Sequence, residues 1–331
     1  MTRSIGILGT GSYVPDRVVT NAEVAALVDV PEEWIAKKTD IVARRYAAPE
    51  EATSDLAAKA AAGALDQAGI TADRLDYIIV STSTPDSPQP PTSYHLQRAL
   101  KADNAACFDI NVVCSGFVYA LHLARGLISQ HPGARVLVAA SDLYSRILDF
   151  SDRRTAVLLG DGAGAVVVGE TAEGSGFLGV ELVSRGEEHR LIRVEAGGSR
   201  QPLTPTTVEE GGHFFRMEGR GVRDFVMENF PPVVDRIAAR VGIPKEEILH
   251  FVPHQPNGVL LTELVKRCGL AHATTHRTLE RYGNVGSASV AVTLDEANRS
   301  GALKDGELTL LGCFGGGMSM AATVLRWAVP A

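Results

Sequence analysis

Short apolar runs bounded by Gly, Pro and Ser alternate along this chain with longer segments of helical period, and this alternation strongly limits the possible folds. Runs of this length and composition are typical of buried strands, and the segments between them are long enough to cover the faces of a sheet. The pattern predicts an α/β protein with layered sheets. We expect helices at 21–28, 54–68, 92–100, 223–241, 258–268 and 287–299, and strands at SIGILG, DYIIVS, CFDINVV, RVLVAAS, AVLLG, AVVVG, FLGVELVS, ILHFVP, LTLLGCF and AATVLRW.

The order of these elements repeats. The first half runs through a strand, a Pro-rich turn, a helix, a strand, Cys114, a helix and a strand. The second half has a similar order: ILHFVP, the HQPN turn, a helix, YGNVGSAS, a helix and LTLLGCF. Such self-similarity predicts two similar halves, residues 1–172 and 173–331. If a pseudo-two-fold axis relates them, the helix start after Cys114 and the turn at Asn284 face one centre. Residues 186–212, rich in Gly, Thr, Pro and Glu, are expected to form a surface excursion.

Charge and cysteine content exclude several classes of function. The formal net charge of −7 and the absence of a basic run argue against a nucleic-acid-binding face. The four cysteines have no C-x-x-C pair and no partnered His spacing, so neither a metal site nor a disulfide framework is expected. The N-terminal apolar run is too short for a secretory signal, and no apolar stretch is long enough to span a membrane. We therefore expect a cytoplasmic protein that does not bind membranes.

Cys114 lies where an apolar run gives way to a segment of helical period. Apolar residues recur after it at Phe117, Ala120, Leu121, Ala124, Leu127 and Ile128, which predicts a helix that begins just past the cysteine. Unpaired N–H groups and the macrodipole at a helix N-terminus would lower the pKa of the Cys114 thiol. A buried structural cysteine is the alternative, and it is the interpretation we adopt for Cys107 and Cys268.

Three other segments have residues suited to a site, each with a simpler explanation. His254 in VPHQPN follows a strand end, where α/β sheets place their sites, but a histidine there can also form only local hydrogen bonds. Asn284 lies between Gly283 and a second nearby glycine, and an ordinary turn would have the same pattern. The three glycines of CFGGGMS would let backbone N–H groups approach a ligand, as in an oxyanion hole, or form a flexible hairpin.

Taken together, VVCSGF, VPHQPN, YGNVGSAS and CFGGGMS, in this order, resemble the β-ketoacyl-(acyl carrier protein) synthase III family of thiolase-like condensing enzymes. GTGSYVP, EEWI and GDGAGA extend the resemblance over nearly the whole chain. It implies a thiolase-like five-layered αβαβα fold with two duplicated halves, a homodimer and a Cys-His-Asn catalytic set. It also implies CoA thioesters as substrates, an acyl carrier protein as partner, and no metal or other cofactor.

The resemblance assigns roles residue by residue. Cys114 matches the acylated nucleophile, and His254 and Asn284 match the pair that stabilises the enolate formed from a malonyl thioester. The backbone N–H groups of Cys114 and Gly316 match the oxyanion hole, with Phe314 beside it. Residues that match contacts to CoA and its pantetheine arm are Trp34, Arg153, Gly219 and Asn257.

Several positions depart from the family pattern. Lys38 stands where the family has an arginine, Arg220 replaces the usual asparagine after Gly219, and Asp40 replaces the glycine of a T-G-I segment. Gln89 occupies the position from which a bulky aromatic of the dimer partner covers the primer pocket. Val259 replaces a basic residue that helps to dock the carrier protein, although Arg220, Arg223, Lys266 and Arg267 could supply positive charge.

The sequence thus predicts an enzyme of this type that primes fatty acid or polyketide synthesis, with a primer other than acetyl as one possibility. One rival function keeps the acyl-Cys114 step but passes the acyl group to a hydroxyl, an amine or a carrier thiol without decarboxylation. A second rival is a non-catalytic protein that binds acyl chains or a partner synthase. The presence of both His254 and Asn284 favours condensation, because simple transfer does not need two donors to an enolate.

Overall fold

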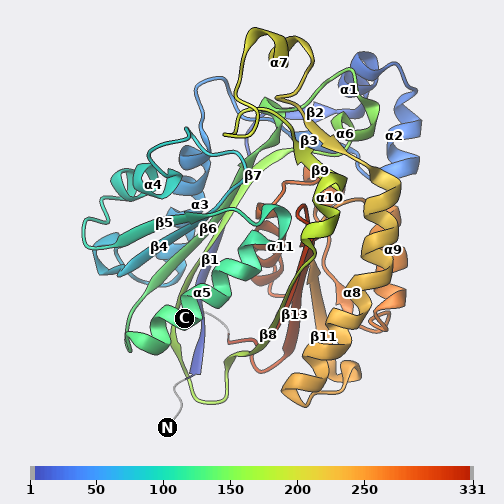
Figure 1. The fold of residues 1–331 in the computed structure, drawn as a ribbon. Coiled ribbons are helices and arrows are strands. Elements are labelled where there is room, and N and C mark those ends of the chain that lie inside the picture. The colour runs from blue at the N-terminus through green and yellow to red at the C-terminus, as the bar shows by residue number, and fades with distance from the viewer. Residues whose placement is uncertain (1–3, 329–331) are drawn as a thin grey trace.

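Two five-stranded mixed sheets form the framework of the computed structural model, which describes residues 4–328 (Figure 1). The outermost residues of both predicted halves, 1–3 and 329–331, therefore lie outside the described part. In order across the first sheet, the strands are β1 (Ser4–Tyr13), β7 (Asp161–Thr171), β6 (Val136–Leu143), β4 (Tyr77–Ser81) and β5 (Ala106–Ile110). Across the second they are β8 (Gly176–Ser184), β14 (Ser319–Arg326), β13 (Leu308–Gly315), β11 (Ile248–Pro253) and β12 (Thr274–Thr275).

The two sheets repeat one topology. Counted from β1 and from β8, the first two strand pairs of each sheet are antiparallel and the last two are parallel. The same order and directions in both sheets are what duplicated halves require. The predicted boundary between residues 172 and 173 falls in the turn that joins β7 to β8.

Helices cover both sheets and also separate them, which gives the five αβαβα layers. α5 (Gly116–Gln130) and α11 (Ala288–Arg299) lie between the sheets and contact strands of both. α3 (Thr53–Gln67) and α4 (Thr92–Leu100) cover the outer face of the first sheet, and α8 (Gly219–Val241) with α9 (Gly258–Arg267) covers the second. The predicted five-layered architecture is thereby confirmed.

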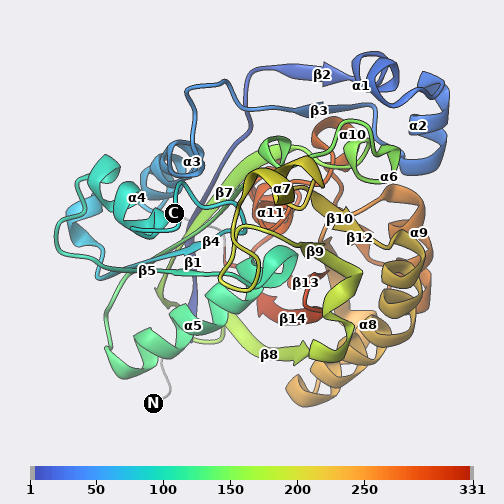
Figure 2. The same cartoon turned by 45° about the horizontal axis from the view of Figure 1, so that its top comes forward.

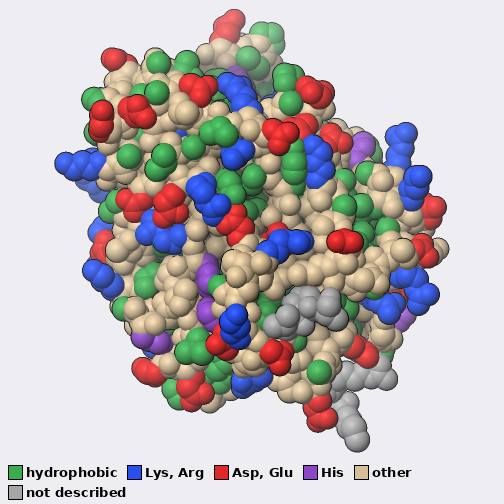
Figure 3. Space-filling view, turned by 180° about the vertical axis from the view of Figure 1, so that it is seen from behind, with side chains coloured by type: hydrophobic (Ala, Val, Ile, Leu, Met, Phe, Trp, Pro, Cys, Tyr) green, Lys and Arg blue, Asp and Glu red, His purple; other side chains and the backbone are tan. Residues whose placement is uncertain are grey.

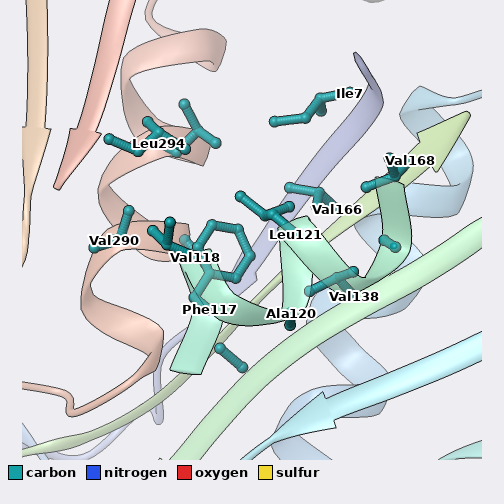
Figure 4. Packing of buried hydrophobic residues seen from close by; sticks show 14 of the residues in the cluster. Ile7, Phe117, Val118, Ala120, Leu121, Val138, Val166, Val168, Val290 and Leu294 are labelled. Carbon is teal, nitrogen blue, oxygen red and sulfur yellow. The ribbon is translucent and has the colours of Figure 1, made fainter. Parts of the chain in front are cut away.

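The middle layer is held by one continuous apolar core. Phe117, Val118, Ala120 and Leu121 of α5 pack with strands of the first sheet and with α11 (Figure 4). These side chains are at most 2% exposed. The predicted apolar face is thus buried except at Leu127, which is partly exposed, and Val118 adds to it. Because burial of each large side chain contributes about 1.5–3 kcal/mol, this core fixes the helix that begins just after Cys114.

Short elements gather around one end of the molecule (Figure 2). The bounds of these elements are α1 (Asn21–Val28), α2 (Glu32–Thr39), α6 (Arg153–Ala156), α7 (Pro205–Glu209), α10 (Leu279–Tyr282), β2 (Val18–Thr20), β3 (Ala43–Arg45), β9 (Ile192–Val194) and β10 (Phe215–Met217). Strand β9, inside the predicted surface excursion, pairs with β10. This pairing places the side chain of Ile192 against a cavity described below, so the segment is more than a surface excursion.

Most predicted elements agree with the structure within a few residues, but one strand is wrong. AVLLG, at 156–160, is not a strand: its first residue ends α6, and the others form the turn that leads into β7. The isolated bridge between Leu159 and Asn284 satisfies part of the backbone of this turn. Val157 and Leu159 are buried and Leu158 is partly buried, and all three face a cavity instead of a sheet neighbour.

Within the described residues, no helix combines the length and the apolar character needed to cross a bilayer. On the face of the molecule seen in Figure 3, basic and acidic side chains are interspersed.

Candidate active site

A cavity of about 700 Å³ opens where the starts of α5 and α11 approach the carboxyl end of β11. It brings together most of the site residues predicted from the sequence, which are Cys114, His254, Asn284, Phe314, Trp34, Lys38, Arg153, Gly219, Arg220 and Asn257. Gln89 and Gly316 do not line it. Gln89 is exposed on the segment before α4, and Gly316 is buried in the turn after β13.

Cys114 lies in a tight turn between β5 and α5. The residue before it, Val113, has φ of 47°, a left-handed conformation that a β-branched residue rarely adopts and that costs about 1–3 kcal/mol. The helix then begins at Gly116, where an added Cβ would lie 1.9 Å from Ser81 Oγ. Close packing at Gly116 and strain at Val113 thus fix Cys114 at the wall of the cavity.

The thiol of Cys114 is 7% exposed and its pKa is raised. Burial is the largest cause, and the nearby carboxylate of Asp142 raises it further, while a hydrogen bond with Tyr144 lowers it. The lowered pKa predicted from the helix N-terminus is therefore wrong, because removal of the thiolate from water outweighs the favourable helix end. The thiol is therefore the resting form, and Cys114 could act as a nucleophile only after loss of its proton.

His254 is neutral at working pH. Its ring lies edge-on to Phe314 with the ring centroids 5.4 Å apart, and burial lowers its pKa to about 3. The backbone N–H of His254 donates to the Gly312 carbonyl at 2.7 Å. The side-chain amide of Gln255 donates to the Pro253 carbonyl and accepts from the backbone N–H of Thr278, at the start of α10. The imidazole is thus held as a neutral group whose one N–H can donate a hydrogen bond.

Asn284 presents its amide with a defined orientation. The backbone N–H of Gly286 donates to Asn284 Oδ1 at 3.0 Å, so the NH₂ group is the free end of the amide. The backbone of Asn284 is tied at both groups: its N–H donates to Leu158 and its carbonyl accepts from Gly160. Because Asn284 lines the cavity, this arrangement offers a second hydrogen-bond donor beside His254.

The glycine turn after β13 approaches Cys114 closely. A Cβ at Gly315 would lie 2.7 Å from the Cβ of Cys114, whereas one at Gly316 would contact Ile192 and Val113 at 3.3 Å. A side chain at position 315 would therefore push this turn away from Cys114. The N–H of Gly316 therefore belongs to the backbone next to Cys114, although the residue is not part of the cavity wall.

Aromatic, cationic and amide groups form the mouth of the cavity. The Arg153 guanidinium lies 5.7 Å from the ring centroid of Trp34. Asn257 Nδ2 donates to the carbonyl of Lys38 at 3.0 Å, while its Oδ1 caps α9 by accepting from the Leu260 N–H. These bonds tie α9 to α2 across the mouth.

The positive charges at the mouth differ in their partners. Glu263 pairs with Arg223 at 2.7 Å and with Arg267 at 3.2 Å. By contrast, Lys38 and Arg220 have no carboxylate within ion-pair distance among residues 4–328. Near them, Val259 is 52% exposed.

The sequence interpretation missed much of the apolar wall of the cavity, which includes Tyr144, Leu159, Ile192, Phe215 and Met217. Phe215 and Met217 come from β10, a strand too short to be recognised from its sequence. Tyr144 follows the end of β6 and packs edge-to-face on Phe215 with centroids 5.4 Å apart. In the described part of the chain, no three His, Cys, Asp or Glu side chains cluster as a metal site would require.

Comparisons with known proteins agree with this arrangement. The model of 3-oxoacyl-[acyl-carrier-protein] synthase III matches residues 108–186, and its C-terminal model matches 238–327. An acetoacetyl-CoA synthase from Streptomyces sp. (strain CL190) is 49% identical, over 97% of this chain and 98% of its own. A β-ketoacyl-[acyl-carrier-protein] synthase III from Caldanaerobacter subterraneus subsp. tengcongensis is 42% identical over 97% of each. The priming β-ketosynthase of the R1128 polyketide pathway has a TM-score of 0.92 at 34% identity, covering 99% of this chain and 98% of that one.

Proposed function

On the premise that this chain belongs to the 3-oxoacyl-[acyl-carrier-protein] synthase III family of condensing enzymes, we propose that it joins an acyl group held on Cys114 to a malonyl thioester. The predicted family, thiolase-like fold and enzyme class, an acyltransferase, are confirmed by these relatives. The observation that carries the proposal is that Cys114, His254 and Asn284, from three separate elements, line one cavity.

The first half-reaction transfers the primer. Cys114 attacks the carbonyl of an acyl thioester and keeps the acyl group while the thiol carrier leaves, so that one hard step becomes two easier ones. The backbone N–H groups of Cys114 and Gly316 are the proposed oxyanion hole. The close approach of the glycine turn to Cys114 supports this assignment.

In the second half-reaction a malonyl thioester loses carbon dioxide. The enolate left behind needs hydrogen-bond donors at its oxygen, and the proposed donors are the N–H of neutral His254 and the NH₂ of Asn284. Burial keeps His254 uncharged, which preserves it as a donor without placing a full charge in an apolar cavity. The carbanion then attacks the acyl-Cys114 carbonyl and yields a 3-oxoacyl thioester.

The mouth suits CoA as the carrier of both substrates. Trp34 and Arg153 are placed to hold the adenine, Lys38 and Arg220 to meet phosphates, and Gly219 and Asn257 to follow the pantetheine arm. The name of the Streptomyces relative, an acetoacetyl-CoA synthase, supports a CoA thioester as product.

An acyl carrier protein is the alternative carrier, and the rim offers it little. Such a partner is acidic and needs free positive charge. Glu263 already pairs with Arg223 and Arg267, Val259 is apolar, and the unpaired Lys38 and Arg220 are the groups proposed to meet the CoA phosphates. We expect malonyl-CoA to be used with a higher kcat/KM than malonyl carrier protein. Glu263→Gln, which releases Arg267 and leaves Arg223 with only Asp224 at 3.2 Å, should raise the rate with the carrier protein. A preference for the carrier protein in the unaltered enzyme would contradict this assignment.

We also propose a homodimer, in which Gln89 would reach the primer pocket of a second copy. Gln89 is exposed and does not line the cavity of its own chain, so only another copy could bring it there. Sedimentation of the purified protein tests the dimer.

One experiment separates condensation from its rivals. The enzyme is incubated with a panel of acyl-CoAs, the mass of the intact protein is measured, and release of labelled carbon dioxide from malonyl-CoA is then followed. Condensation requires an adduct on Cys114 and carbon dioxide release that depends on Asn284. Acyl transfer to another acceptor without release would refute condensation, and the absence of any adduct would indicate a non-catalytic protein.

A further inference from the structure

The thiol of Cys114 borders a chain of polar groups that the proposed reaction does not yet use. Tyr144, which is 1% exposed, lines the cavity with Cys114, and its hydroxyl interacts with the Cys114 thiol and lies 2.9 Å from the Oγ of half-buried Ser83. Ser83 Oγ in turn donates to Asp142 Oδ1 at 3.0 Å. The chain therefore runs from the nucleophile through two hydroxyls to a carboxylate.

The direction of these hydrogen bonds follows from the number of protons available. A serine hydroxyl has one proton, and Ser83 gives it to the Asp142 carboxylate, which can only accept. Ser83 Oγ is then the acceptor for the Tyr144 hydroxyl, and in the thiol form the Tyr144 oxygen is left to accept from Cys114. In the thiolate form the Tyr144 hydroxyl donates to the sulfur instead, and this is the interaction that lowers the pKa of Cys114.

Asp142 is fully buried and held from both sides. The backbone N–H of Ser83 donates to Oδ1 at 2.8 Å, and the N–H and hydroxyl of Ser287 donate to Oδ2 at 2.8 and 2.7 Å. Burial nevertheless raises the pKa of this carboxyl group, which makes Asp142 a better proton acceptor than an exposed aspartate. The other buried base that lines the cavity, His254, has a pKa of about 3 and holds a proton poorly.

The motif GNVGS makes room for this arrangement. Gly286 has φ of 58°, and a Cβ there would lie 2.3 Å from Tyr144 Cε2 and 2.4 Å from Asp142 Oδ2. The glycine next to Asn284 therefore lets the tyrosine and the aspartate sit against the start of α11. The thiol of Cys313, the remaining titratable group near Cys114, hydrogen-bonds to the carbonyls of Ser115 and Ala321 and lies outside the chain.

We propose that Tyr144 and Ser83 relay the proton of the Cys114 thiol to Asp142 when Cys114 is acylated. The S–H bond breaks and its proton passes to the Tyr144 oxygen, the Tyr144 proton passes to Ser83 Oγ, and the Ser83 proton passes to the carboxylate. The hydroxyl of Tyr144 then donates to the thiolate that attacks the thioester, and the departing CoA thiolate takes a proton from solvent. After condensation the thiolate of Cys114 leaves, and the same chain runs in reverse, so that Asp142 returns the proton.

This inference rests on the proposed nucleophilic role of Cys114, and removal of one hydroxyl tests it. Tyr144→Phe keeps the ring, and Tyr46→Phe is the matched control, because the Tyr46 hydroxyl is also buried but has no partner among the described residues and does not line the cavity. The rate of Cys114 alkylation by iodoacetamide is measured against pH, with the modified residue identified by peptide mass. Tyr144→Phe should slow alkylation near neutral pH by tenfold or more and shift its profile to higher pH, whereas Tyr46→Phe should leave both unchanged.

Two further measurements exclude a merely structural effect. Ser83→Ala leaves the Tyr144 hydroxyl in place but breaks the relay, so it should reproduce the shifted profile, and the double variant should be no slower than either single one. Tyr144→Phe enzyme that has been acylated by long incubation should decarboxylate malonyl-CoA at the unaltered rate, since no thiol proton remains.

A normal alkylation profile in Tyr144→Phe or Ser83→Ala, or slow decarboxylation by the acylated variant, would overturn the relay. The absence of any acyl adduct on the unaltered enzyme would instead refute the proposed function, and the alkylation profiles would still decide whether the relay acts on the thiol.

Discussion

Neutral His254 gives the stability of this protein a specific dependence on pH. Burial lowers the pKa of His254 from 6.5 to about 3, so the folded state excludes a proton that the unfolded state binds below its ordinary pKa. A group of this kind destabilises the fold as the pH falls through the unfolded value, by about 1.4 kcal/mol for each pH unit until the folded pKa is reached. Between about pH 7.5 and about pH 5, His254 alone should therefore cost about 2 kcal/mol of the free energy of unfolding.

The variant His254→Asn isolates this contribution. Urea denaturation at the two pH values gives the loss of stability for each protein, and the loss should be about 2 kcal/mol smaller in His254→Asn than in the unaltered chain. His276, whose pKa is also lowered by burial to about 4, is present in both proteins and cancels in the comparison. His189→Asn, on an exposed turn, is the control and should lose as much stability as the unaltered protein.

The outcome bears directly on catalysis. Suppose that His254→Asn and the unaltered protein lose the same stability on acidification. His254 would then take up its proton in the folded state near its ordinary pKa of 6.5. The proposed role of His254 as a neutral hydrogen-bond donor to the enolate would then be refuted. If the difference appears, the decarboxylation step should show no titration of His254 between about pH 5 and about pH 8.

Three further changes should give distinct results. Asn284→Ala should lower carbon dioxide release by about 10²–10³-fold, the usual effect of losing one oxyanion donor, while the mass of the acyl adduct on Cys114 stays unchanged. Gly116→Ala should destabilise the fold by about 1–3 kcal/mol in urea, because its Cβ would lie 1.9 Å from Ser81 Oγ; the control on the same helix, Gly126→Ala, meets open space and should not destabilise. Arg220→Ala should raise the KM for acyl-CoA about tenfold with little change in kcat, whereas an unchanged KM would place the phosphates elsewhere.

Strands were predicted correctly where the apolar residues of a segment are buried against neighbouring strands and helices. DYIIVS and ILHFVP became β4 and β11 because several adjacent apolar residues are buried on both faces of a sheet. AVLLG has the same character, but its leucines face a cavity, and no local signal distinguishes a cavity wall from a sheet neighbour. A short apolar segment can therefore be predicted as a strand only if it is known whether a sheet neighbour or a cavity faces it.

His254 and Asn284 became candidates because an apolar segment breaks at glycine or proline there, and the family resemblance then favoured a site over a simpler explanation; both line the cavity. Tyr144 has no such break, and its partner Ser83 lies 61 positions away in the chain, so only the folded structure brings the two hydroxyls together. The pKa of Cys114 was predicted in the wrong direction for a related reason. The helix start is visible in the sequence, but the burial that dominates the pKa is not.

The core that joins α5 to α11 limits how substrates can enter. Side chains from both sheets, such as Val138 and Val252, belong to one packed cluster with these two helices. Because close-packed side chains resist sliding, we do not expect the two halves to move apart and close around a ligand. We expect the long arm of a CoA thioester to enter through an opening of fixed width while its nucleotide stays outside. The length of the arm, and not a closing motion of the protein, would then bring the thioester to Cys114.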